Sequence, residues 1–218
     1  MKLLVVNPNT TEAVTELLAA RVRAVAGAAV DVQAITARFG AAYIASETSY
    51  VIAAHAALEA CRAHCEACGR PDAIIVGCFG DPGVFALREA LSVPVVGLAE
   101  AAMREAARHG RYAIVTGGAA WQPMLLRLAR ALELAERLTS VAIVAPTGAQ
   151  LAADREGAIA TLREACVGAA AGADALVLGG AALAGMAEAI ASSMEPPLAI
   201  PLIDSVDAAA RAALATLR

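Results

Sequence analysis

The cysteine best placed to do chemistry is Cys78, in the segment AIIVGCFGDPG that spans residues 73–83. The apolar, β-branched run Ala73–Val76 predicts a strand that is buried on both faces. Gly77 and Gly80 then allow a tight turn with close backbone approach. Ligands of open α/β sheets bind at the carboxyl ends of the strands, so this turn is a candidate ligand site.

A helix is expected directly after this turn, because Asp81 and Pro82 are typical of an N-cap and a first helical residue. The dipole and free N–H groups of such a helix favour an anion. We therefore expect them to lower the pKa of the Cys78 thiol. The alternative is that Cys78 is a small, inert core residue, since free cysteines are usually buried. Position alone does not decide between these two interpretations.

The rest of the chain alternates apolar runs with helical patterns, which predicts an α/β fold with parallel sheets and covered faces. The expected strands are 2–6, 30–36, 73–76, 93–98, 112–115, 140–144, 175–178 and 200–203. The expected helices are about 12–26, 50–68, 82–91, 100–109, 121–134, 150–171, 186–193 and 206–217.

The two halves of the chain form a weak internal repeat. Three pairs of segments match in the same order: 94–102 with 201–209, 73–78 with 175–180, and 3–7 with 112–116. The repeat predicts two similar lobes that face each other across a cleft. The first lobe is expected to span residues 1–98, completed by the C-terminal helix 206–218, and the second residues 99–205. The alternative is that any two βαβ stretches look alike.

A cleft lined by backbone N–H groups, hydroxyls and one thiolate suits proton transfer at carbon, with the N–H groups holding the resulting enolate. Cys78 is the predicted acid/base. The expected groups that bind the substrate are Asn9, Thr10, the N–H groups of Phe79 and Gly80, Thr116, Gly117, Gly118, and the N–H groups of Gly180 and Ala181. The loop-like segment 38–49, with Tyr43, is either a lid or substrate-binding element, or its tyrosine packs in the core.

Composition argues against several classes of partner. The net charge is −4 and no basic run is present, so we expect no nucleic acid. The densest apolar stretch, 175–187, is shorter than the about 18 residues that a membrane span needs. The sequence shows no signal peptide and five cysteines, so we expect a cytoplasmic protein with reduced thiols. Cys61, Cys65 and Cys68 share one helical face, so we expect no metal.

Several motifs together resemble the aspartate/glutamate/hydantoin racemase superfamily, and its hydantoin-racemase-like branch in particular. They are NPNT, CFGDPG, PVVGLAEAAM, LVLGG…AGMAE and PLIDSVDAA. The resemblance implies two flavodoxin-like lobes related by a pseudo-two-fold axis and an active site between them, without a cofactor. It also implies two cysteines, one from each lobe, on opposite sides of the substrate's α-carbon. Cys78 matches the cysteine of the first lobe.

The sequence departs from this pattern in the second lobe, where Gly180 stands in place of the cysteine and three extra residues follow. Three interpretations remain open. A water or a hydroxyl, from Thr116 or Ser205, replaces the second thiol; the enzyme is a single-cysteine decarboxylase of a substituted malonate; or the protein only binds a small anion. We expect the first, a racemase or epimerase of a small carbonyl compound such as a hydantoin, allantoin or amino acid, and we expect a homo-oligomer.

Overall fold

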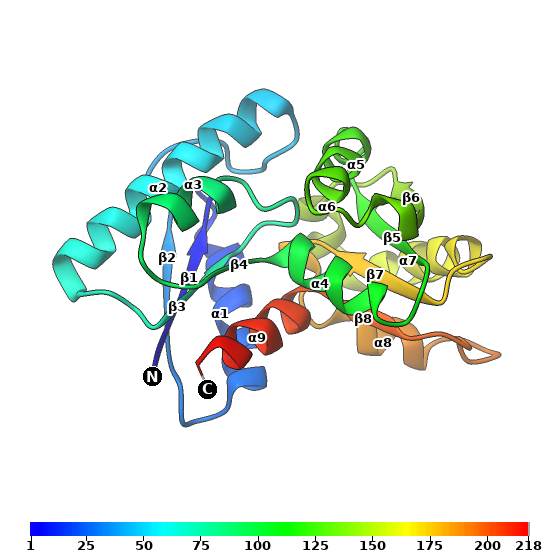
Figure 1. The fold of residues 1–218 in the computed structure, drawn as a ribbon. Helices are drawn as coiled ribbons and strands as arrows, with labels where there is room; N and C mark the ends of the chain where they lie inside the picture. The colour runs from blue at the N-terminus through cyan, green and yellow to red at the C-terminus, as the bar shows by residue number, and fades with distance from the viewer. Residues whose placement is uncertain (218) are drawn as a thin grey trace.

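The computed structural model describes residues 1–217, so residue 218 of the predicted C-terminal helix lies outside the described residues. It contains two parallel four-stranded sheets with the orders β2-β1-β3-β4 and β6-β5-β7-β8 (Figure 1). The strands are β1 Lys2–Asn7, β2 Asp31–Thr36, β3 Ala73–Val76, β4 Val95–Gly97, β5 Tyr112–Gly117, β6 Leu138–Val144, β7 Ala175–Gly179 and β8 Leu202–Asp204. The predicted α/β fold with two lobes is confirmed.

The two sheets also share their register, as the internal repeat predicts. Val6 pairs with Val76 in the first sheet, and Val115 pairs with Leu178 in the second. The repeat matches these same four residues to one another. The central strands β1, β3, β5 and β7 are almost entirely buried, which explains why their sequences are continuous apolar runs.

Helices cover the faces of both sheets. They are α1 Glu12–Ala26, α2 Glu47–Cys68, α3 Val84–Ala90, α4 Leu98–Ala107, α5 Trp121–Ala131, α6 Gly148–Ala153, α7 Arg155–Ala169, α8 Met186–Ser192 and α9 Ser205–Thr216, with short 3₁₀ turns at η1 Ala135–Arg137 and η2 Ala181–Leu183. The single helix expected over 150–171 is two helices, because the Asp154 carboxylate accepts a bond from Gly157 N–H and starts α7. Among residues 1–217, no helix is both long and apolar enough to span a bilayer.

Two helices cross between the lobes. Helix α4 follows β4 of the first sheet but packs against β7 of the second, whereas α9 follows β8 and packs against α1 and β3 (Figure 1). The two helices also pack against each other. This exchange joins the lobes through shared helices. The division into residues 1–98 plus the last helix, and residues 99–205, stays a prediction.

The predicted role of Asp81 is wrong. Helix α3 begins at Val84 with Gly83 as its N-cap, and Asp81 precedes it in a left-handed conformation with φ +58°. The Asp81 carboxylate instead accepts bonds from Ala99 N–H (2.8 Å) and Glu100 N–H (2.7 Å), in the first turn of α4. Asp81 therefore caps α4, whose residue Ala99 lies 18 positions further along the chain.

The repeat explains this arrangement. In the second lobe the residue before α9 is Asp204, which caps its own helix by accepting from Val206 N–H and Asp207 N–H. The matching residue before α4 is Gly97, and a Cβ there would lie 2.2 Å from the Asp81 carboxylate. The carboxylate of Asp81 thus occupies the space that a side chain at position 97 would need.

Candidate active site

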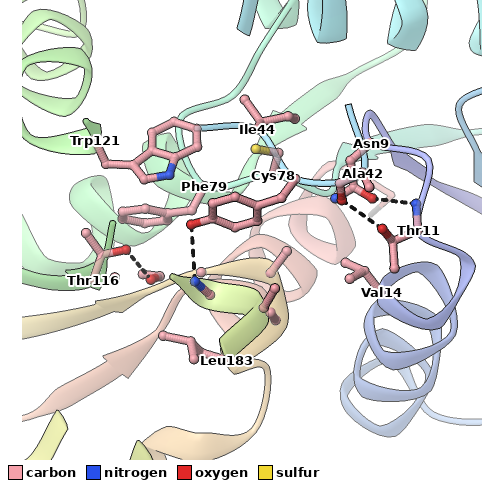
Figure 2. A pocket seen from close by; sticks show the side chains of 18 residues that line it. Asn9, Thr11, Val14, Ala42, Ile44, Cys78, Phe79, Thr116, Trp121 and Leu183 are labelled. Carbon is pink, nitrogen blue, oxygen red and sulfur yellow. Dashed lines mark hydrogen bonds between the residues drawn. The ribbon is translucent and has the colours of Figure 1, made fainter. Parts of the chain in front are cut away.

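A cavity of about 90 Å³ lies where the carboxyl ends of the strands of both lobes meet. Its lining from the first half of the chain is Asn9, Thr11, Val14, Ala42, Tyr43, Ile44, Cys78 and Phe79, and from the second half Thr116, Gly117, Trp121, Gly148, Ala149 and residues 179–183. Figure 2 shows the Cys78 sulfur among these side chains, with Leu183 and Thr116 contributed by the other lobe. The cavity is therefore shared between the two lobes.

Cys78 lines the cavity, with 7% of its surface exposed. Its pKa is raised, first by burial and then by the nearby Asp81 carboxylate. The expectation of a lowered pKa is therefore wrong. Burial has the largest effect, the Asp81 carboxylate adds to it, and the helix expected to lower the pKa begins only at Val84. The thiol rests protonated and needs a partner or a bound substrate to give up its proton.

The predicted binding residues divide into two groups. Those that line the cavity are Asn9, Phe79, Thr116, Gly117, Gly180 and Ala181. Thr10, Gly80 and Gly118 are not in the lining. The N–H of Thr10 donates to Ala41 O, that of Gly118 donates to Val144 O, and Gly80 lies against the Trp121 ring.

Three groups on the cavity wall are suited to holding an oxyanion. Asn9 Oδ1 already accepts bonds from Asn7 Nδ2 and Thr11 N–H, both at 2.9 Å, so its Nδ2 is the end of the amide that faces a ligand. The N–H groups of Ala181 and Ala182 begin the η2 turn, where the first N–H groups have no acceptor within the turn.

Gly180 N–H does not belong to this donor set, because it donates to Ser205 Oγ at 3.3 Å. Ser205, in turn, is 1% exposed and is absent from the lining of the cavity. Thr116 Oγ1 faces the cavity, but its proton is committed to Gly179 O at 2.7 Å. Of the two hydroxyls suggested by the sequence as replacements for a thiol, only Thr116 reaches the site.

The loop between β2 and α2 closes one side of the cavity. Thr11 Oγ1 donates to Ala42 O at 2.7 Å, and the next residue, Tyr43, accepts a bond from Gly148 N–H at 3.1 Å through its hydroxyl oxygen. At the end of the loop, Glu47 forms an ion pair with Arg127 of α5. The loop is thus attached to both lobes, and Tyr43 is part of the cavity wall.

Residues 3–213 match the Asp/Glu/Hydantoin racemase family. This chain belongs to that family. It is 33% identical over 217 residues to hydantoin racemase of Paenarthrobacter aurescens, covering 98% of this chain and 89% of the relative. It is 31% identical over 209 residues to hydantoin racemase of Pseudomonas sp. (strain NS671), covering 94% and 82%.

Among solved structures, the chain is similar to allantoin racemase from Klebsiella pneumoniae, with a TM-score of 0.91 and 31% identity over 100% of this chain and 87% of that one. Together with the family match, these relatives identify an enzyme of the isomerase class, a racemase, as the sequence predicted. Within residues 1–217 of this racemase, no group of three or more His, Cys, Asp or Glu side chains is arranged to hold a metal ion.

The position that the repeat matches to Cys78 is Gly180, and its backbone is unsuited to a thiol. Its φ is +151°, and a Cβ there would lie 3.0 Å from Leu183 Cγ. We therefore expect Gly180→Cys to lower the free energy of unfolding of the racemase by about 1–3 kcal/mol. We also expect no gain in activity. Urea denaturation and the racemisation rate test this, and a stable, more active variant would contradict it.

Proposed function

We propose that this racemase inverts a carbon next to the carbonyl of a small, uncharged ring of the hydantoin type, with Cys78 moving the proton and no cofactor. One observation carries the choice of substrate. Among the described residues, no Asp, Glu, Lys, Arg or His side chain lines the cavity. A charged amino acid or malonate would lose its hydration there and find no counterion, which costs much free energy. A neutral imide carries no charge, so its transfer into the cavity costs far less.

The relatives support the same substrate class. The names of the curated relatives specify hydantoin, and that of the similar structure specifies allantoin. Each name describes the relative, which is 31–33% identical to this chain. We therefore propose the hydantoin-type ring itself rather than a particular side chain.

The proposed reaction begins with loss of the α-proton. Cys78, once deprotonated, takes this proton, and the electrons of the C–H bond move into the carbonyl to form an enolate. Asn9 Nδ2 and the N–H groups of Ala181 and Ala182 donate to the enolate oxygen. Return of a proton to the opposite face of the carbon completes the inversion.

The apolar wall strengthens these interactions. Ile44, Phe79, Trp121 and Leu183 are each nearly or fully buried and surround the polar groups. A dry, apolar site increases the strength of each hydrogen bond to a developing negative charge. The same wall excludes water, which would otherwise compete for the donors on Asn9 and η2.

The test uses the purified chain without added cofactor. Decay of the optical rotation of an enantiopure 5-substituted hydantoin is the expected result, with no decay for a free amino acid. A decarboxylase would release CO₂ from a substituted malonate instead. A binding protein would change neither substrate, although a ligand would raise its Tm. Either of these last results would refute the proposed function.

A further inference from the structure

A racemase that removes the α-proton with one side chain and returns a proton with another needs a second proton carrier on the side of the substrate opposite Cys78. Four lining side chains carry an exchangeable proton on sulfur or oxygen: Thr11, Tyr43, Cys78 and Thr116. Both threonine protons are already donated to carbonyl oxygens, by Thr11 to Ala42 O and by Thr116 to Gly179 O, each at 2.7 Å. Aliphatic hydroxyls are also much weaker acids than a phenol, whose ordinary pKa is about 10.

Tyr43 has the geometry that the other candidates lack. It belongs to the first lobe in sequence, but its hydroxyl lies against the second, 3.1 Å from Gly148 N. A Cβ on Gly118, also in the second lobe, would lie 3.1 Å from the same oxygen. The phenol oxygen therefore lies against the second-lobe side of the cavity, whereas Cys78 lines it from the first lobe.

The single hydrogen bond given to the Tyr43 hydroxyl within residues 1–217 leaves its proton free for exchange. Its oxygen accepts a bond from Gly148 N–H, which holds the hydroxyl in place on the cavity wall. Among the described residues, the Tyr43 O–H donates to no protein acceptor, so its proton is available to a molecule in the cavity. Tyrosine is an established general acid and base in enzymes.

From this geometry we propose that Tyr43 is the second proton carrier of the racemase, in place of the missing second-lobe thiol. The inference rests on the proposed function and names the group that completes it. Before the substrate reacts, the pair of groups has lost one proton to solvent, from Cys78 in one direction and from Tyr43 in the other. In the first direction the Cys78 thiolate takes the α-proton, and the enolate then takes the Tyr43 hydroxyl proton on its other face. The products are the inverted substrate, a Cys78 thiol and a Tyr43 phenolate. The reverse direction uses the phenolate as base and the thiol as acid.

The test is Tyr43→Phe, examined with each enantiomer separately in deuterated water. We expect inversion to fall about 100-fold or more in both directions. The enantiomer whose α-proton faces Cys78 should still exchange that proton for deuterium with retention of configuration. The other enantiomer should lose exchange. A purely structural role for Tyr43 would instead reduce exchange of both enantiomers equally.

Tyr112→Phe is the matched control, because it also removes a tyrosine hydroxyl, one that donates to Leu134 O and is absent from the cavity lining. Its inversion and exchange rates should match those of the wild type. Inversion at the wild-type rate in Tyr43→Phe, or equal loss of exchange for both enantiomers, would overturn the assignment of Tyr43. Absence of exchange and inversion in the wild type would refute the proposed function itself, and the assignment with it.

Discussion

Cys78→Ala is expected to reduce kcat for racemisation by about 10³-fold, because a positioned acid/base contributes about 10²–10⁴-fold. Cys78 is the only cysteine in the lining of the cavity among the described residues. The change removes one sulfur from the cavity wall, so the fold should remain intact. Optical rotation measures the rate, and thermal unfolding verifies that the variant is folded.

Cys61→Ala is the matched control for this experiment. Cys61 is a second buried thiol of the same lobe, on α2, and burial raises its pKa to about 12. It lies outside the cavity lining, so its loss should leave kcat near the wild-type value. Wild-type racemisation by Cys78→Ala would remove Cys78 from the mechanism.

Asp81→Ala should lower the free energy of unfolding by about 4 kcal/mol. The change leaves the N–H groups of Ala99 and Glu100 buried without an acceptor, at a cost of about 1–3 kcal/mol each. It also places alanine at φ +58°, which costs further free energy. Urea denaturation at a fixed pH measures the loss.

Asp154→Ala is the control for that prediction, because Asp154 is an exposed cap that accepts a single bond from Gly157 N–H. Its loss should cost about 1 kcal/mol, as is typical of an N-cap. Asp81→Asn keeps one acceptor oxygen and tolerates the left-handed backbone. Its loss in free energy of unfolding should therefore lie between those of Asp154→Ala and Asp81→Ala. If Asp81→Ala cost no more than Asp154→Ala, the capping of α4 by Asp81 would be energetically unimportant.

The sequence predicted most of the fold, because its signals are local. The buried runs at 73–76 and 175–178 are strands at those residues, apart from one added glycine at the end of β7. The repeat also predicted the equivalence of the two sheets, since matched residues occupy matched positions in the strand register. The positions of these strands follow from apolar periodicity, which is a property of neighbouring residues and does not depend on distant contacts.

The sequence predicted the site only in part, because several contacts that shape the site join residues far apart in the chain. Asp81 has the local pattern of an N-cap, but its partners belong to α4. Tyr43 meets Gly148 across 105 positions, and no local pattern indicates that pairing. The pKa of Cys78 was misjudged for the same reason, since it is raised first by burial under distant segments of the chain and then by the Asp81 carboxylate.

The most direct test of proton transfer by Cys78 is deuterium incorporation at the α-carbon of an enantiopure 5-substituted hydantoin in deuterated water, followed by NMR. We predict that the inverted product of the wild-type enzyme carries deuterium, and that Cys78→Ala incorporates almost none into the enantiomer whose α-proton faces Cys78. Inverted product that retains its original proton, or undiminished deuterium incorporation into both enantiomers by Cys78→Ala, would contradict this prediction.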